Sequence, residues 1–400
     1  MDYISKVLPS LGVEGVKVKT WQAWAREGVR RHLPMLPRRQ AEDTPEIVSR
    51  LKLHPGFLRV LQHQIETVSN PPNADGVVED FLGLFMDLPT LVRLMDESAP
   101  GSFTESELER AWDWARRQRG RLYDWISGDR EEGAELDEED DAVLLRLWQM
   151  RVGKLRAPGR GKRPLRYAHM VVDEVQDLSP LEVQVLLDTL DGRNSVTLSG
   201  DTQQHIIEQA GFTDWREFFG DIGQDETSVN TLKVSYRSTH EITSFAREVL
   251  GDLAEDDHPP MTTRPGAPVE LFRFTDDGAC VAFLADALME LIRREPLASI
   301  AVLTPSPTIS GIYARGLQLA EVPRVRHVLD QQFAFAPGIE VTEVAEVKGL
   351  EFDYVVLVEF SAQYYPDNGH ARRLLHVGAT RAAHQLWLTS VGEPSTILND

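Results

Sequence analysis

The sequence predicts an α/β protein with mostly parallel sheets, preceded by a helical region. Two observations carry this prediction. From Leu165 onward, short apolar runs alternate with amphipathic stretches, and strands that alternate with helices form parallel sheets covered on both faces. Between residues 29 and 150, apolar residues recur at helical spacing without strand alternation, which indicates helices joined by polar loops.

The N-terminal part is predicted to be helical. VKVKTWQAWARE (16–27) is a short strand candidate that runs into a helix containing Trp21 and Trp24. Helical spacing recurs in 57–65, 81–95 and 108–126, with Pro and Gly between these stretches. We interpret this region as a helical insertion or arm.

The first α/β series starts with an apolar strand at 169–173, which is followed by a helix at 181–190 and a strand at 195–199. Residues 229–234 are a strand candidate, 239–250 a helix with a Ser/Thr cap, and 255–266 a linker candidate. The second series predicts strands at 269–274, 299–303, 324–329, 340–344, 354–359 and 385–389, and helices at 279–293, 308–319 and 371–383. We expect two sheets, the first only partly present.

Length and composition limit the class of protein. Four hundred residues exceed what one core usually supports, so two or three domains are expected. The single cysteine, Cys280, excludes an intramolecular disulfide and fits a reducing compartment. No apolar run is long enough to span a bilayer, and residues 1–10 lack a signal-peptide pattern. We therefore expect a cytoplasmic protein without a membrane partner.

The net charge of −21 argues against a broad electrostatic contact with nucleic acid. The charge is uneven, however. DREEGAELDEEDD (129–141) carries nine acidic residues, whereas RVGKLRAPGRGKRPLR (151–166) carries seven basic residues and no acid. One interpretation of both stretches is a solvated loop whose like charges repel one another. The basic stretch is also a candidate contact for phosphate or for a protein partner.

The most informative stretch is MVVDEVQDLSP (170–180), where a buried strand ends in acidic residues. Open α/β sheets bind ligands at the carboxyl ends of their strands. There, Asp173 is suited to hold a magnesium ion and Glu174 to take a proton from an attacking water. The alternative is a solvated acidic turn after a core strand.

Four further polar clusters follow on successive α/β units. They are SGDTQQ (199–204), KVSYRSTHE (233–241), VKGLEFD (347–353) and HVGATRAAHQLWL (376–388). Each alone is weak, because a GD after a strand is usually a turn and a lone Arg on a helix is usually solvated or salt-bridged. Four such clusters in this order on successive α/β units favour a functional explanation over chance.

These segments resemble motifs II to VI of the superfamily 1 UvrD/Rep-like helicases. DEVQD resembles motif II, GDTQQ motif III, YRST motif IV, KGLEFD motif V and VGATRA motif VI. The resemblance covers about 165–400, and KTWQAWA (19–25) resembles the earlier Thr-Phe-His motif. Within the family, the chain is most similar to the HelD-like, RNA-polymerase-associated ATPases. The resemblance implies RecA-like sheets of the P-loop NTPase type, one partial and one complete, with ATP and Mg²⁺ bound between two domains.

The resemblance also implies roles for individual residues. Asp173 would hold the metal, Glu174 would activate the hydrolytic water and Gln204 would sense the γ-phosphate. Arg237 would contact the γ-phosphate, and Arg381 would act as the arginine finger that stabilises charge in phosphoryl transfer.

Further residues would bind ligands rather than act in catalysis. Tyr236 would stack on adenine, and Glu351, next to Gly349, would contact the ribose. Thr20 and Trp21 are the candidates for contact with nucleic acid. The implied domains are 1–28 (remnant of a first RecA-like domain), 29–164 (helical arm), 165–228 (remainder of the first domain) and 229–400 (second domain).

One expected motif is missing, because no GxxxxGK[ST] phosphate loop occurs in the sequence. Gly159–Lys162 (GRGK) is too short and lacks the following Ser or Thr. In the family this loop precedes the Thr-Phe-His motif, which here begins at Thr20. We therefore favour a C-terminal portion of a longer protein whose N-terminal part carries the loop, over an ATPase-dead relative.

Other departures concern the target. Ile207 and Gln209 stand where relatives place aromatic residues that stack on single-stranded DNA, and Glu343 and Ala345 stand where motif V carries Thr and His. Only about 110 residues separate motif IV from motif V, which leaves little room for the usual insertion.

The hypothesis is an ATP-dependent DNA helicase or translocase that acts on single-stranded DNA or remodels RNA polymerase. The alternative is a non-catalytic module that binds polymerase or nucleic acid; a nuclease is a weaker third.

Overall fold

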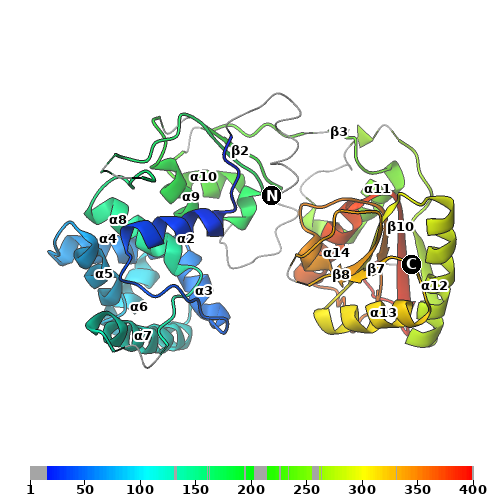
Figure 1. Ribbon diagram of the computed structural model, residues 1–400, viewed down its shortest axis with the longest axis horizontal. Coiled ribbons are helices and arrows are strands. Elements are labelled where there is room, and N and C mark those ends of the chain that lie inside the picture. Colours follow the sequence, from blue (N-terminus) through cyan, green and yellow to red (C-terminus); the bar gives the residue numbers. More distant parts are fainter. Residues whose placement is uncertain are drawn as a thin grey trace. The chain divides into compact units, whose positions relative to one another are not determined.

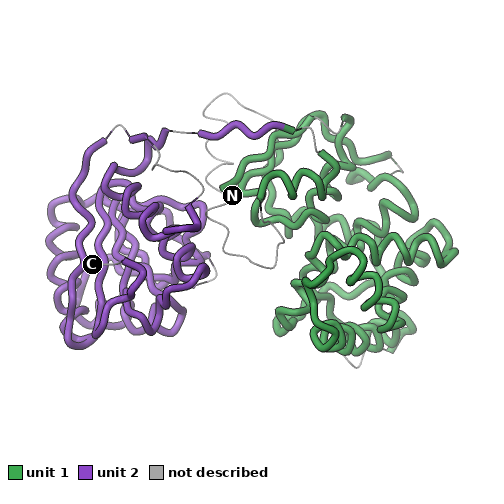
Figure 2. The backbone as a smooth tube through the Cα atoms, turned by 180° about the vertical axis from the view of Figure 1, so that it is seen from behind, with its two compact units in different colours: residues 1–202, 207–227 green, residues 203–206, 228–400 purple. Residues whose placement is uncertain are grey.

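The computed structural model describes residues 16–129, 133–159, 161, 163–192, 195–201, 214–224, 227–232, 234–254, 261–262, 264–329 and 331–398. The chain forms two compact units, and along the described residues the division falls between 227 and 228 (Figure 2). Gln204, Ile207 and Gln209, to which the sequence assigns functional positions, lie outside the described residues.

Unit 1 is mainly helical (Figure 1). Its helices are α2 (Trp21–His32), α3 (Glu46–Leu53), α4 (Phe57–Thr67), α5 (Ala74–Gly83), α6 (Leu88–Ser98), α7 (Glu105–Ser127), α8 (Asp140–Arg151), α9 (Pro180–Leu187) and α10 (Trp215–Asp221). Its two strands, β1 (Met170–Val172) and β2 (Val196–Leu198), pair in parallel. A short 3-10 helix, η1 (Val175–Asp177), follows β1.

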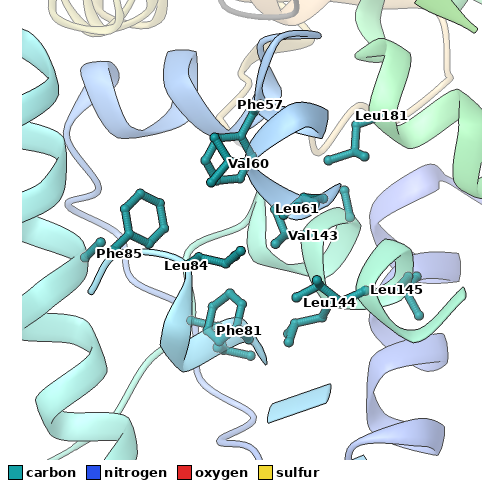
Figure 3. Packing of buried hydrophobic residues seen from close by; sticks show 14 of the residues in the cluster. Phe57, Val60, Leu61, Phe81, Leu84, Phe85, Val143, Leu144, Leu145 and Leu181 are labelled. Atoms are coloured by element: carbon teal, nitrogen blue, oxygen red, sulfur yellow. The ribbon is translucent and has the colours of Figure 1, made fainter. Parts of the chain in front are cut away.

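Helix α8 is the centre of unit 1. Most of its residues are buried, and it contacts α2, α4, α5 and α9. Figure 3 shows Val143, Leu144 and Leu145 of α8 among side chains from α4 and α5. Leu181 of α9 belongs to the same cluster. The helical region and the segment that carries the first acidic motif therefore share one hydrophobic core.

Two predictions for unit 1 are wrong. Residues 16–19 form no strand, and the chain enters α2 directly, where Thr20 caps the helix by accepting a hydrogen bond from the amide of Ala23. Residues 81–95 form two helices rather than one. Asp87 accepts a hydrogen bond from the amide of Thr90 and so starts α6 as a new helix, with Pro89 in its first turn.

A buried charge cluster joins α3, α7 and α8. Lys52 Nζ lies 2.5 Å from both Asp137 Oδ2 and Asp140 Oδ1, and all three side chains are almost fully buried. Trp114 and Gln118 of α7 donate further hydrogen bonds to the two carboxylates. Burial alone would lower the pKa of Lys52, but the two carboxylates raise it above its usual value. The acidic stretch predicted to be a solvated loop is therefore partly a core element.

Unit 2 contains a six-stranded sheet that is parallel throughout (Figure 1). The strands are β5 (Glu270–Phe274), β6 (Ser299–Thr304), β7 (Val325–His327), β8 (Gly338–Glu343), β9 (Phe352–Leu357) and β10 (Ala382–Val391), in the order β5-β10-β9-β6-β8-β7. The fold class is thus confirmed as α/β with parallel sheets and an N-terminal helical region.

Helices cover both faces of this sheet. α11 (His240–Leu250) and α14 (Gly369–Thr380) form one core with Ala301 and Leu303 of β6. α12 (Asp277–Arg294) and α13 (Pro307–Leu319) form another with Ile300 and Val302. Alternate residues of a strand point to opposite faces, so burial on both faces explains why these strands are apolar throughout.

The remaining differences lie at segment ends. Residues 229–232 form no strand. Instead, β3 (Val234–Ser235) pairs in parallel with β4 (Met261–Thr262), and β4 lies inside the predicted linker at 255–266. α14 ends at Thr380, three residues before its predicted end, because β10 already starts at Ala382. Two 3-10 segments, η4 (Gly251–Leu253) and η5 (Val344–Val347), follow α11 and β8. No helix in the described parts combines the length and apolar character needed to cross a bilayer.

We expect Lys52→Met to destabilise unit 1 by about 3–5 kcal/mol, because it leaves two buried carboxylates without their cation. Urea denaturation followed by tryptophan fluorescence measures this, since seven of the eight tryptophans precede residue 228. The exposed Lys154→Met is the matched control and should change stability by less than about 0.5 kcal/mol. Equal unfolding midpoints for the two variants would contradict the prediction.

Candidate functional site

The first polar cluster lies at the carboxyl ends of β1 and β2. The two strands pair up to Val172 and Leu198, so Asp173 and Ser199 follow them side by side. Ser199 Oγ donates a hydrogen bond of 2.7 Å to Asp173 Oδ1, and the amide of Val175 donates one of 2.9 Å to the carbonyl oxygen of Ser199. The segments that resemble motifs II and III are therefore brought together.

Gln176 holds this cluster in place. It is fully buried; its Nε2 donates to Glu174 Oε2 at 2.6 Å, and its Oε1 accepts from the amide of Asp201 at 3.0 Å. A Cβ at Gly200 would lie 2.3 Å from that same Oε1, so a larger residue there would displace the Gln176 side chain from this position. The motifs in the sequence assign no role to Gln176. The signal in the sequence that could have indicated a role is a polar residue, Gln176, directly after the apolar Val175.

Glu174 has an unusual backbone conformation. Its φ and ψ are 52° and 43°, in the left-handed region that non-glycine residues seldom occupy. Such a conformation costs about 1–3 kcal/mol and persists where the surroundings hold it. Here Glu174 is half-buried, and the hydrogen bond that its carboxylate accepts from Gln176 fixes the direction in which the carboxylate points.

Asp173 fits the chemistry of a magnesium ligand. Its carboxylate is exposed at the strand end and has a hydroxyl beside it. Within the described residues, no group of three or more His, Cys, Asp or Glu side chains is arranged for a metal ion. Magnesium is commonly held by one or two carboxylates plus water and substrate phosphates, so a single exposed carboxylate is compatible with this kind of site and not with a closed protein cage.

The second polar cluster lies at the amino ends of β9 and β10 in unit 2. Ser238 Oγ donates to the carbonyl oxygen of Ala382 at 2.7 Å. One guanidinium nitrogen of Arg264 bonds to the carbonyl oxygens of both Arg237 (2.8 Å) and Ala383 (2.6 Å). These bonds attach the segment that resembles motif IV to the first residues of β10.

Arg237 and Glu351 form an ion pair in this cluster. Arg237 Nε lies 2.6 Å from Glu351 Oε2, and the two side chains are 46% and 63% exposed. Pairs as exposed as this contribute about 0–1 kcal/mol, so either partner can exchange for another ligand at little cost. The neighbouring Tyr236 is 74% exposed and presents a flat aromatic surface to solvent.

Arg381 is placed differently from the others. It is 1% exposed, and its Nε donates to the carbonyl oxygen of Val377 at 3.1 Å. Its two terminal nitrogens donate to the carbonyl oxygen of Leu350 and to Thr380 Oγ1. Leu350 follows Gly349, whose φ of 75° forms the turn. Arg381 thus fastens the segment that resembles motif V, and contact with a phosphate would require these bonds to break.

Thr20 and Trp21 contribute to neither cluster in this structure. Thr20 Oγ1 is used to cap α2. Trp21 stacks obliquely on Trp24, with ring centroids 5.6 Å apart, and packs on the core of unit 1. Their assignment to nucleic-acid contact stays a prediction.

Comparison with known proteins identifies part of the second unit. Residues 338–389, from β8 to near the end of β10, match the UvrD-like helicase C-terminal domain. The chain is related to the UvrD-like DNA helicases. This segment contains Gly349, Glu351 and Arg381 of the second cluster.

Relatives of known name support the same relation. The ATP-dependent DNA helicase UvrD2 of Mycobacterium tuberculosis and that of Mycobacterium bovis are each 30% identical to this chain over 165 residues. The match covers 39% of this chain and 23% of either relative, less than a quarter of their length. A crystal structure of the C-terminal domain of a possible DNA helicase from Lactobacillus plantarum is 27% identical, covers 41% of this chain and 92% of that one, and has a TM-score of 0.35.

The helix after the first cluster predicts a pH effect. Glu182 of α9 is buried and accepts hydrogen bonds from the amide and hydroxyl of Ser179. The pKa of Glu182 is raised from 4.5 to about 7, mainly by burial and further by the charges of Glu139 and Glu138, which together outweigh the hydrogen bonds from Ser179. Because the folded-state pKa lies above the unfolded value, this group favours folding below pH 4.5, and that advantage is lost as the pH rises through 7.

We therefore expect Glu182→Gln, which keeps an acceptor for Ser179, to gain stability relative to the wild type between pH 4.5 and 8. The gain should approach about 3 kcal/mol. Urea denaturation at several pH values measures it, with exposed Glu109→Gln as the control that should follow the wild-type curve. A pH-independent difference between Glu182→Gln and wild type would refute the assignment.

Proposed function

We propose that this chain is the nucleotide-responsive portion of an ATP-dependent UvrD-like DNA helicase or translocase, built on RecA-like sheets of the P-loop NTPase type. One observation carries the proposal. The segments at 236–238, 348–351 and 381 come from distant parts of the sequence, yet they meet at the amino ends of β9 and β10. They meet within or beside the matched helicase domain.

The second cluster suits a nucleotide. The exposed ring of Tyr236 offers a stacking surface for a base, and Arg237 offers a planar fork for phosphate. A phosphate carries more charge than Glu351, so it would displace this weak ion-pair partner. Glu351 would then be free to accept hydrogen bonds from ribose hydroxyls. Arg381 would hold the turn at Gly349 until a ligand draws the guanidinium away from Leu350.

The first cluster suits the metal and the water. Asp173 would hold Mg²⁺, whose other ligands come from water and phosphate, and the metal would offset charge on the phosphates when bound. Glu174, aimed by Gln176, would accept a proton from water. Gln204 keeps its proposed role as the γ-phosphate sensor. The names of the UvrD2 relatives support ATP as the nucleotide.

A second candidate function rests on the carboxyl end of β8. Glu343 lies there, and burial together with the charge of Glu346 raises the pKa of Glu343. Two carboxylates at this position disfavour a phosphate backbone, whereas they suit a basic protein surface. The alternative is therefore a non-catalytic module that binds RNA polymerase. Co-purification with polymerase that is insensitive to nucleotide would favour this alternative, and failure to bind polymerase would remove it.

We expect Tyr236→Ala to weaken binding of Mg²⁺–ATP by about 5- to 150-fold, because stacking on one base contributes about 1–3 kcal/mol. Titration with a fluorescent ATP analogue measures the affinity. Tyr123→Ala, which removes an aromatic ring that is 63% exposed on α7, is the matched control. Equal affinities for the wild type and both variants would place the nucleotide elsewhere.

We also expect the chain to hydrolyse ATP no faster than background. Without a GxxxxGK[ST] loop, the backbone amides and the lysine that cradle the phosphates are missing. Phosphate release in steady state, with and without single-stranded DNA, measures this. Clear turnover that Glu174→Gln abolishes would show that the chain completes an ATPase site by other means.

A further inference from the structure

A small basic hollow lies in unit 1 and shares no residue with either polar cluster. It is formed by α2 and the segment that follows this helix, and its volume is about 40 Å³. One water needs about 10–15 Å³, so the hollow has room for a group several times that size. Four arginines line it: Arg26, Arg30, Arg38 and Arg39.

The positive charge of this hollow is only half compensated. Arg26 Nε lies 2.7 Å from Asp141 Oδ2, and Arg39 Nε lies 2.5 Å from Glu135 Oε1. Arg30 and Arg38 form no ion pair with any described residue. Among the described residues, the four guanidinium groups and the two carboxylates that pair with them give an excess charge of +2, in a protein whose overall charge is −21.

One lining residue carries a donor without a partner. Gln40 lines the hollow, and its Nε2 is buried without a hydrogen-bond partner among the described residues. The backbone around this residue is fixed, because the amide of Leu136 donates to the carbonyl oxygen of Arg39 and the amide of Ala41 donates to that of Leu136. A buried donor without a partner costs about 1–3 kcal/mol, and a rotation of the Gln40 amide toward an acceptor in the hollow would recover that cost.

Apolar walls act mainly on Arg26, which is half-buried, since the other three arginines are exposed. Val29, Leu33 and Leu36 are buried and line the hollow. Charges beside low-dielectric walls interact more strongly than charges in water. The carboxyl end of α2 carries about half a negative elementary charge, which repels an anion. The excess charge of +2 outweighs this repulsion.

We infer that this hollow binds a tetrahedral oxyanion, specifically a phosphate group. Guanidinium forks match phosphate oxygens in a bidentate manner. The excess charge is balanced by one free phosphate, which carries about −1.5 to −2 charges near pH 7, or by neighbouring strand phosphates with one negative charge each. The phosphate belongs either to a small free anion or to the backbone of a nucleic-acid strand. The site shares no residue with the proposed nucleotide site, so it does not depend on that proposal.

The test uses the full chain at low ionic strength with two probes: pyrophosphate, followed by calorimetry, and a fluorescent oligothymidylate, followed by anisotropy. Arg30→Ala/Arg38→Ala removes the two uncompensated arginines. Arg116→Ala/Arg117→Ala on α7 removes the same charge from two exposed arginines outside the hollow and is the matched control.

We expect the first double variant to bind at least one probe about tenfold or more weakly, since each lost charge-assisted bond contributes about 1.5–3 kcal/mol. The control double variant should bind as the wild type does. A specific loss with pyrophosphate identifies a free anion as the ligand, and a loss with the oligonucleotide alone identifies a strand backbone. Binding of neither probe by the wild type, or equal weakening in both double variants, overturns the inference.

Discussion

The parallel pairing of β9 with β10 is the constraint on which the second cluster depends. Ala382 pairs with Phe352, and the amide of Phe352 donates to the carbonyl oxygen of Arg381. Parallel strands start at the same edge of a sheet, so the residues just before each strand become neighbours. This register alone brings Glu351 and Arg381 together, and the bonds of Ser238 and Arg264 to the start of β10 then add Arg237.

A buried polar side chain plays the corresponding part in unit 1. Gln176 ties Glu174 to the amide of Asp201, and Gly200 leaves the space that this amide group needs. Asp173, Glu174 and Arg237 are exposed or half-buried, whereas Gln176 and Arg381, which hold the segments in place, are buried, although Arg381 also resembles a catalytic residue. The proposed chemistry therefore rests on side chains whose own contacts are structural.

How far the sequence predicts the structure depends on whether the signal is local. The strand near Val302 was predicted correctly, because burial on both faces leaves an uninterrupted apolar run. The strand near Val172 was predicted from the same signal, but Val171 in it is 67% exposed, so one of its faces is not buried. The break between α5 and α6 near Asp87 was missed, because the apolar residues on both sides of it keep the spacing expected of a single helix. The burial of Arg381 and of Lys52 could not be predicted, since their partners Leu350 and Asp137 come from distant segments. The same holds for the arginine-lined hollow.

The central claim is that nucleotide binds at the amino ends of β9 and β10. Hydrogen–deuterium exchange of the chain, with and without saturating Mg²⁺–ATP, tests it most directly, because it reads every segment of the sheet at once. If nucleotide binds there, exchange should slow in 236–238 and 348–352 and stay unchanged in 357–361, at the carboxyl end of β9. Protection confined to 357–361, or no protection anywhere in 228–398, would contradict the central claim.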